Sequence, residues 1–205
     1  MIGLINYGSG NIYAISNIYK SLNIPYIISD DTDELAKASK LVLPGVGAFD
    51  ETMSLLGSKG LTDWLNEQVL EKSTPIIGVC VGMQIMTNGS EEGTLPGFGW
   101  VDAEVKKFDP STLDKKPHLP HLGWNVAVPK DEGHHLFADV DVERGFYYLH
   151  SYYCKCNDES DILSTTEYGI SYTSAFQHGN VYGVQFHPEK SHHNGTAILK
   201  NFANS

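Results

Sequence analysis

Ile76-Ile77-Gly78-Val79-Cys80-Val81-Gly82 is the stretch of the chain with the most specific pattern. The short apolar run predicts a buried strand, and residues 83–87 are compatible with a helix. A small residue two positions before and after a cysteine is typical of a nucleophile elbow, a strained turn whose middle side chain projects outward. The stretch therefore predicts a reactive Cys80, with a helix start that favours its thiolate. The alternative is a buried cysteine in a glycine-flanked turn.

The residues before this stretch alternate between short apolar runs and helical periods. Strands are predicted at residues 2–6, 25–28 and 41–43, and helices at 12–22, 31–38, 50–56 and 61–70. Asn11 is a candidate cap for the first helix, which has an apolar face formed by Ile12, Ile15, Ile18, Tyr19 and Leu22. Such alternation predicts a parallel sheet with helical crossovers.

The residues after position 100 have a strand-rich pattern. Strands are predicted at residues 101–107, 124–128, 146–150, 162–166, 172–177 and 181–186, and a final helix at 195–202. We find neither an internal repeat nor a linker long enough to separate two domains. The sequence predicts one α/β domain over residues 1–205, with a mostly parallel central sheet and a β-rich C-terminal extension.

Composition narrows the class of protein. A chain of 205 residues that is 41% hydrophobic and 19% charged has the composition of a globular domain, which excludes disordered and fibrous classes. The net charge of -11 has the wrong sign for neutralising phosphodiesters, so no nucleic-acid partner is expected. The sequence has no long apolar run, no basic signal-peptide start and three cysteines, so we expect no membrane span and a cytoplasmic location.

A histidine and a carboxylate follow the last predicted strand, in Gly183-Val184-Gln185-Phe186-His187-Pro188-Glu189. A cysteine nucleophile needs a base to take its proton, and the base needs an acceptor that orients its ring. We therefore predict that Cys80 is the nucleophile, His187 the general acid and base, and Glu189 the orienting carboxylate. A lone histidine at a strand end is usually structural, but the neighbouring carboxylate and the elbow favour the catalytic interpretation.

Two glycines follow another predicted strand, in Leu43-Pro44-Gly45-Val46-Gly47-Ala48. Acyl transfer needs two N–H donors aimed at the developing oxyanion. Val81, directly after the nucleophile, supplies one, and the loop at Val46 and Gly47 is the candidate for the other. As an isolated motif, Pro-Gly-x-Gly is equally a structural turn.

Nine histidines raise the question of a metal site. The candidates are His134-His135, His192-His193 and the pair His118 and His121. No cysteine or carboxylate set accompanies them in the sequence to complete a tetrahedral site, and the chemistry predicted for Cys80 needs no metal. We expect neither a metal nor another cofactor.

Four motifs together resemble the class I glutamine amidotransferases. They are Pro-Gly-Val-Gly at 44–47, Gly-Val-Cys-Val-Gly-Met-Gln at 78–84, Pro-His-Leu-Gly-Trp-Asn at 120–125 and Gly-Val-Gln-Phe-His-Pro-Glu-Lys-Ser at 183–191. The resemblance runs nearly end to end and implies a flavodoxin-like three-layer sandwich. Residues 6–11, 120–125 and 148–152 are similar to the glutaminase subunits of imidazole glycerol phosphate synthases, and they separate the chain from anthranilate, carbamoyl-phosphate and GMP subunits.

The resemblance implies that glutamine is hydrolysed to glutamate and ammonia through a thioester on Cys80. The ammonia would pass to a separate cyclase subunit, which is a (β/α)8 barrel that forms a heterodimer with the glutaminase. There it would convert a phosphoribulosyl-formimino aminoimidazole carboxamide ribotide into imidazole glycerol phosphate and an aminoimidazole carboxamide ribotide. This reaction belongs to histidine biosynthesis.

The resemblance also implies roles for residues outside the triad. By motif position, glutamine is held by Gly47, Gln84, Glu92, Ser151 and Tyr152. The barrel is contacted by His121, Trp124, Asn125 and Lys190, although a tryptophan opening a β-run, such as Trp124, is as often a core residue. The family more often has leucine than valine after the nucleophile, a change that leaves the Val81 N–H available.

Three alternative functions are compatible with the sequence. A paralogous glutaminase subunit would supply ammonia to another acceptor, such as a sugar-amidating enzyme of surface polysaccharide synthesis. A non-catalytic scaffold would bind a partner without hydrolysis, which the intact triad argues against. A stand-alone cysteine hydrolase of γ-glutamyl peptides would be active without any partner.

Overall fold

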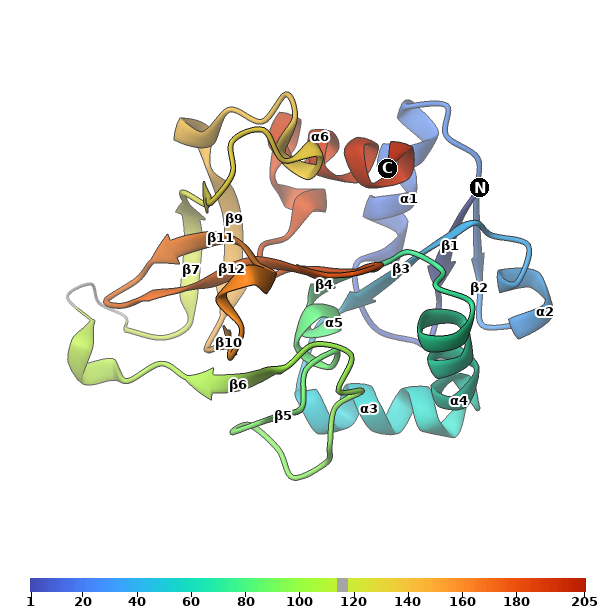
Figure 1. Cartoon of the computed structure of the whole chain (residues 1–205), viewed down its shortest axis with the longest axis horizontal. Helices are drawn as coiled ribbons and strands as arrows, with labels where there is room; N and C mark the ends of the chain where they lie inside the picture. The colour runs from blue at the N-terminus through green and yellow to red at the C-terminus, as the bar shows by residue number, and fades with distance from the viewer. Residues whose placement is uncertain (114–117) are drawn as a thin grey trace.

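An 11-stranded sheet forms the centre of the computed structural model, which describes residues 1–113 and 118–205 (Figure 1). The strand order is β2 (Tyr26–Ser29), β1 (Ile2–Ile5), β3 (Lys40–Gly45), β4 (Ile76–Cys80), β13 (Val181–Val184), β12 (Ser171–His178), β10 (Tyr152–Cys156), β6 (Ala103–Lys107) and β5 (Gly89–Ser90). Off this order, β11 (Ile162–Glu167) pairs with β12, and β8 (Val128–Pro129) pairs with β11. A separate antiparallel pair consists of β7 (His121–Asn125) and β9 (Phe146–His150).

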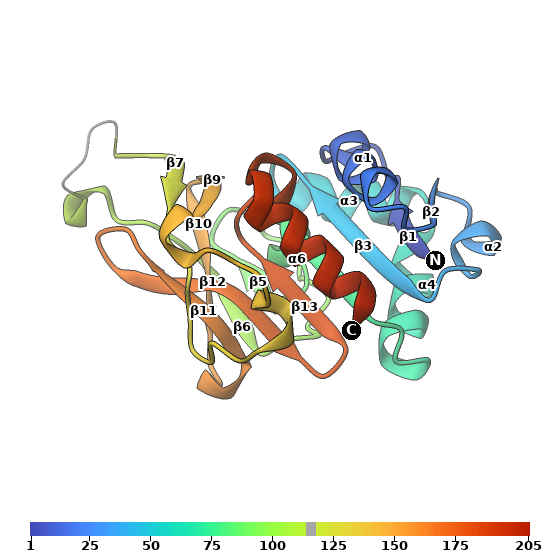
Figure 2. The same cartoon turned by 90° about the horizontal axis from the view of Figure 1, so that it is seen from above.

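Helices cover both faces of the parallel half of the sheet. One face carries α1 (Ile12–Ser21) and α6 (His192–Asn204), and the other carries α3 (Phe49–Ser58), α4 (Leu61–Asn66) and α5 (Val81–Gln84) (Figure 1). Figure 2 looks onto the face with α1 and α6. The short α2 (Thr32–Leu35) lies beside β1 and β2. This arrangement confirms the predicted three-layer α/β fold with a mostly parallel central sheet.

The remaining helical segments are short. They are 3₁₀ turns at Pro110–Thr112, His135–Phe137, Val142–Arg144, Glu159–Asp161 and Pro188–Lys190, and a π-helical turn at Glu67–Glu71 that extends α4. Among the helices of residues 1–113 and 118–205, none combines the length and the apolar character that crossing a membrane requires.

The parallel strands bring three chain segments to one edge of the sheet. Strands β1, β3, β4 and β13 are buried at every residue, as expected for strands covered on both faces. Strand β4 pairs in parallel with β3 and with β13, so that Cys80 lies opposite Gly45 and Val79 lies opposite Val184. The loop after β3, the turn after β4 and the segment after β13 therefore leave the sheet side by side.

The predicted β-rich extension is confirmed as strands β12, β10, β6, β11 and β8, which pair with one another mainly in antiparallel fashion. Strand β10 was not predicted. Only Ser151 separates it from β9, and no glycine or proline marks the point where the chain passes from the small sheet to the large one. Asn11 occupies the N-cap position of α1, as predicted, but its side chain makes no capping hydrogen bond; its carbonyl oxygen accepts from Ala14 and Ile15.

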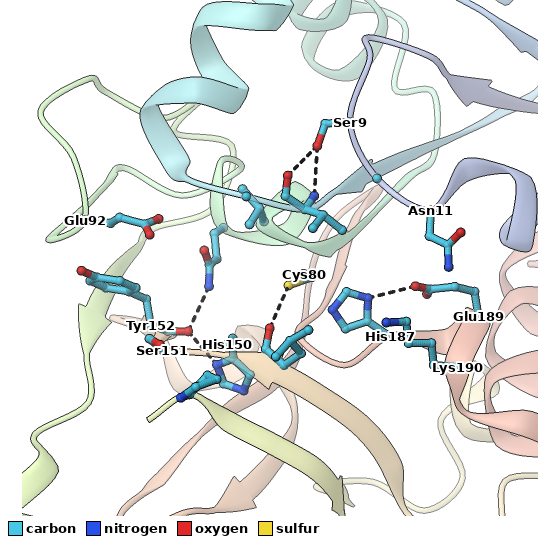
Figure 3. Close-up of a pocket in the computed structure, with 17 residues that line it drawn as sticks. Ser9, Asn11, Cys80, Glu92, His150, Ser151, Tyr152, His187, Glu189 and Lys190 are labelled. Atoms are coloured by element: carbon cyan, nitrogen blue, oxygen red, sulfur yellow. Dashed lines mark hydrogen bonds and ion pairs between the residues drawn. The ribbon is translucent and has the colours of Figure 1, made fainter. Parts of the chain in front are cut away.

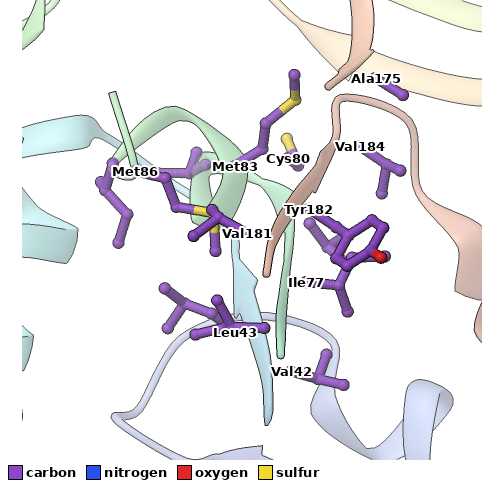
Figure 4. Packing of buried hydrophobic residues seen from close by; sticks show 14 of the residues in the cluster. Val42, Leu43, Ile77, Cys80, Met83, Met86, Ala175, Val181, Tyr182 and Val184 are labelled. Carbon is purple, nitrogen blue, oxygen red and sulfur yellow. The ribbon is translucent and has the colours of Figure 1, made fainter. Parts of the chain in front are cut away.

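Close packing between β3 and the start of α5 fixes the turn after β4. A Cβ atom at Gly82 would lie 2.0 Å from the Leu43 carbonyl oxygen, and one at Gly78 would lie 2.5 Å from the Gly82 carbonyl oxygen. Both approaches involve backbone atoms, so a side chain cannot be accommodated by a change of rotamer. Figure 4 shows Met83 of α5 and Met86, two residues after its end, against one face of these strands, with Val42 and Ile77 on the other face.

We predict that Gly82→Ala lowers the free energy of unfolding by about 1–3 kcal/mol, because the new methyl group must displace the β3 backbone. Urea unfolding followed by circular dichroism measures this change. The matched control is Gly89→Ala, because a Cβ at Gly89 meets no atom within 4 Å. Its effect should stay within about 0.5 kcal/mol. Equal stability of the two variants would contradict the packing account of the turn.

Candidate active site

A cavity of about 700 Å³ opens at the edge of the sheet where β3, β4 and β13 end (Figure 3). Its lining includes Cys80, His187 and Glu189, which lie far apart in the sequence. The β9–β10 connection supplies another part of the wall, from Leu149 to Tyr152. The structure therefore brings the predicted nucleophile, base and carboxylate together in one concave site.

Cys80 occupies a strained position between β4 and α5. Its backbone has φ 55° and ψ -112°, in the half of φ space that non-glycine residues rarely adopt. Such strain persists only where the surrounding structure enforces it, as the glycine contacts at positions 78 and 82 do here. The side chain is buried, and the Gln185 Nε2 donor lies 3.7 Å from its Sγ. This geometry matches the strand-to-helix elbow predicted from the sequence.

His187 lies between the cysteine and a buried carboxylate (Figure 3). Its backbone N–H donates to the Tyr147 carbonyl oxygen at 2.9 Å, and the Ser191 hydroxyl donates to its carbonyl oxygen at 2.6 Å. The Nδ1 atom lies 3.0 Å from Oε1 of Glu189, whose side chain is 1% exposed. Because a carboxylate accepts, Nδ1 carries hydrogen and Nε2 is left for the cysteine.

The charge state of His187 depends on both neighbours. Burial alone would lower the pKa of His187, but hydrogen bonds to Cys80 and Glu189, together with their negative charges, outweigh burial and raise it to about 10. The ring is therefore an imidazolium at neutral pH, held between Cys80 and the Glu189 carboxylate. Oε2 of Glu189 is buried without a hydrogen-bond partner in the described part of the chain. The carboxylate therefore interacts with His187 through its other oxygen, Oε1.

The loop after β3 differs from its predicted role. The Val46 N–H donates to the Ser9 hydroxyl at 3.3 Å, and that hydroxyl donates to the Val46 carbonyl oxygen at 2.5 Å. The Val46 donor is therefore already in use, and an oxyanion role requires this contact to open. Gly47 has φ +114°, a conformation that glycine adopts without strain. Val81 begins α5, so its N–H has no acceptor within the helix.

All five residues that the resemblance implies hold glutamine line the cavity, namely Gly47, Gln84, Glu92, Ser151 and Tyr152. Gln84 is buried, and its Nε2 donates to the Tyr152 carbonyl oxygen and to Oε1 of Gln185, each at 3.0 Å. Oε2 of Glu92 accepts from the Phe49 N–H at 2.9 Å, at the first residue of α3. The favourable charge of a helix start therefore holds Glu92 at the cavity.

Among the residues of the site that were not predicted from the sequence are Ser9, His150 and Gln185. Gln185 contacts both Gln84 and Cys80, and it lies directly after β13 and two residues before His187. Its place within the quoted motif at 183–191 was a usable signal. His150 lines the cavity and lies within the quoted segment 148–152. No local pattern marks Ser9, because its contact to Val46 joins residues 37 positions apart.

Strands β7 and β9 present an apolar surface beside the cavity. Leu122, Trp124 and Leu149 are exposed on it, and Nζ of Lys190 lies 5.3 Å from the centre of the Tyr147 ring. Trp124 is 48% exposed, so it is not a core residue. His121, which was expected to contact a partner, is only 3% exposed and stacks on Tyr168 with ring centres 4.0 Å apart. Alternation along β7 turns His121 inward.

The histidine pairs do not build a metal site within residues 1–113 and 118–205. In those ranges no group of three or more His, Cys, Asp or Glu side chains is placed to hold a metal ion. The His134 and His135 rings lie with centres 4.5 Å apart, and Nε2 of His134 is 2.9 Å from Oε1 of Gln177.

Comparison with known proteins gives a family and a fold. The family described as Glutamine amidotransferase class-I matches residues 4–205. The chain is 43% identical to the imidazole glycerol phosphate synthase subunit HisH of Leptospira interrogans, over 99% of both chains. It is 45% identical to subunit HisH 2 of Methanococcus maripaludis, over 98% of both. A Thermoplasma acidophilum structure assigned to a GMP synthase has a TM-score of 0.73 at 21% identity, covering 99% of this chain and 92% of that one, and shares the fold.

We predict that Cys80→Ser lowers the pKa of His187 from its value of about 10, because the hydrogen bond and electrostatic interaction of Cys80 that raise it are removed while burial still lowers it. Ring ¹³C shifts of labelled histidine, followed from pH 5 to pH 10.5, measure this titration. His150 is an internal control, since burial lowers its pKa to about 3 and keeps it neutral throughout. A wild-type His187 that loses its proton near pH 6.5 would contradict the ion-pair assignment.

Proposed function

The chain belongs to the class I glutamine amidotransferase family, and we propose that it is the glutaminase subunit of an imidazole glycerol phosphate synthase. Full-length identities of 43% and 45% to subunits of that name support this function. The observation that carries it is the meeting of Cys80, His187 and Glu189 in a cavity large enough for an amino acid. The proposed unit is one glutamine amidotransferase domain over residues 1–205.

The first half of the reaction forms a thioester. The Cys80 sulfur attacks the side-chain amide carbon of glutamine, and the amide oxygen becomes an oxyanion. The Val81 N–H stabilises this charge, and the loop at Val46 and Gly47 supplies a second donor once the Ser9 contact opens. His187 then gives its proton to the nitrogen, the carbon–nitrogen bond breaks, and ammonia leaves.

Loss of the thiolate prepares the second half. When the sulfur is acylated, its charge and its hydrogen bond no longer raise the pKa of His187, and burial lowers it. The neutral ring takes a proton from a water molecule as the oxygen attacks the thioester carbon. The carbon–sulfur bond breaks, glutamate leaves, and the thiolate pairs again with the imidazolium. Glu189 holds the ring and its charge in both halves.

Neutral donors and one carboxylate recognise the substrate in this proposal. Glu92 accepts from the ammonium group of glutamine, because a carboxylate fixed at the cavity wall complements that charge. Both Nε2 hydrogens of Gln84 are used within the protein, which leaves its Oε1 as the atom available to a ligand. Gly47, Ser151 and Tyr152 complete the wall.

The partner in this proposal is a cyclase subunit with a (β/α)8 barrel that consumes the ammonia in the cytoplasm. Ammonia released into water is protonated and lost, so the cavity must be covered by the enzyme that uses it. The exposed residues Leu122, Trp124 and Leu149 form the apolar centre of a docking face, and Lys190 lies beside them at the cavity. Asn125 and His121 support this face from beneath.

The test measures glutamine hydrolysis by the chain alone, and then with the barrel partner loaded with its phosphoribulosyl ribotide. We expect strong stimulation by the loaded barrel and no turnover by Cys80→Ala in either condition. Trp124→Ala should weaken the complex by about tenfold or more in Kd, measured by calorimetry, because buried tryptophans dominate interfaces. Leu70→Ala is the control, since Leu70 is exposed on the Glu67–Glu71 turn, away from β7 in Figure 1.

Other outcomes identify the alternatives. High activity without a partner indicates a stand-alone hydrolase, and no hydrolysis under any condition indicates a scaffold. Failure of the barrel to stimulate, combined with stimulation by a sugar-amidating enzyme, indicates the paralogous function. Unchanged binding by Trp124→Ala would contradict the docking face.

A further inference from the structure

A buried cluster of polar rings lies behind the cavity wall and has no part in the mechanism above. It contains His121 of β7, His150 at the end of β9, and Tyr172 of β12. All three side chains are buried, and among them His150 lines the cavity. Buried polar groups of this kind are stabilising only when their hydrogen bonds are satisfied in a consistent pattern.

The hydrogen positions on His150 follow from its two partners. Its Nδ1 lies 2.7 Å from the Tyr152 carbonyl oxygen, which can only accept, so Nδ1 carries hydrogen. Burial lowers the pKa of His150 to about 3, and the ring is neutral. Its Nε2 therefore has no hydrogen and accepts from the Tyr172 hydroxyl at 3.2 Å.

The same reasoning extends to β7. Because the Tyr172 hydroxyl gives its hydrogen to His150, its oxygen accepts from Nδ1 of His121 at 3.1 Å. Nε2 of His121 then accepts from Nδ2 of Asn125 at 3.3 Å. These contacts form a chain of hydrogen bonds in which every donor points the same way. It runs from Asn125 through His121, Tyr172 and His150 to the Tyr152 carbonyl oxygen.

This carbonyl oxygen joins the buried chain to the active site. It also accepts from Nε2 of Gln84 at 3.0 Å, as Figure 3 shows. The second Nε2 hydrogen of Gln84 goes to Gln185, which in turn contacts Cys80. The Gln84 side-chain amide therefore cannot rotate by 180° without breaking two hydrogen bonds. One of its two acceptors, the Tyr152 carbonyl oxygen, is held in place by His150.

We propose that His150 is a positioning residue for glutamine, whose ring fixes the cavity wall at Ser151 and Tyr152 and, through the shared carbonyl oxygen, the orientation of Gln84. The inference rests on the proposed function, because the ligand is glutamine. His150 contacts neither Cys80 nor the other members of the triad by any hydrogen bond within the described residues. Its loss should therefore affect substrate binding more than chemistry.

The experiment compares His150→Leu with His150→Asn in the complex with the barrel subunit. Leucine fills the space but donates nothing, whereas the asparagine amide can donate from nearly the position of Nδ1. We expect His150→Leu to raise the KM for glutamine about tenfold, the usual scale for one lost buried hydrogen bond, with a much smaller change in kcat. His150→Asn should restore most of the KM. Iodoacetamide should alkylate Cys80 at the wild-type rate in both variants.

A second pair of variants keeps the test independent of folding at position 150. Tyr172→Phe removes the hydroxyl that orients His150, and it should raise the KM several-fold. Tyr148→Phe is the matched control, because its equally buried hydroxyl bonds to Thr166 and lies outside the chain of hydrogen bonds. It should leave the KM unchanged, although its Tm should fall as in Tyr172→Phe.

The outcomes separate this inference from the proposed function. An unchanged KM in His150→Leu would overturn the positioning role. So would a lower kcat, a higher KM and a lower Tm that appear together and that His150→Asn does not relieve. Wild-type protein that hydrolyses no glutamine with the barrel would instead defeat the proposed function, and this inference with it.

Discussion

The structure depends on one close contact between backbones, where α5 starts against the end of β3. A Cβ atom at Gly45 would lie 2.4 Å from the Gly82 nitrogen, and Gly82 itself leaves no room beside the Leu43 carbonyl oxygen. Between these tightly packed glycines the chain leaves β4 through a residue at positive φ, and that residue is Cys80. The sulfur is thereby placed at the end of β4, next to the segment that follows β13.

Burial strengthens the electrostatic attraction between the charged groups of this site. The Glu189 carboxylate has His187 as its hydrogen-bond partner, and both side chains are almost completely buried, so their attraction is weakly screened. A buried ion pair costs solvation, and here the hydrogen bonds of His187 to Cys80 and Glu189 offset that cost. The polar network around Gln84, Gln185 and His150 is largely satisfied by uncharged donors, which leaves the triad as the charged centre of the cavity.

Much of this could be predicted from the sequence, because the decisive signals were local. Uninterrupted apolar runs identified the buried strands, and glycines flanking Cys80 identified the elbow. What could not be predicted depends on contacts between distant segments. The Ser9 contact to Val46 and the contacts of Tyr172 to His121 and His150 join residues 22 to 51 positions apart, and no short motif encodes them. Strand β10 was missed because one serine alone separates two strands of different sheets.

The central claim is that the sulfur of Cys80 carries the glutamyl group during turnover. Acid quenching of the complex during glutamine hydrolysis, followed by mass spectrometry of the peptides, tests it directly. The account predicts an adduct with the mass of one γ-glutamyl group on the peptide containing Cys80, present during turnover and lost when glutamine is exhausted. Steady hydrolysis with an adduct on another residue, or with none on Cys80 at any quench time, would contradict it.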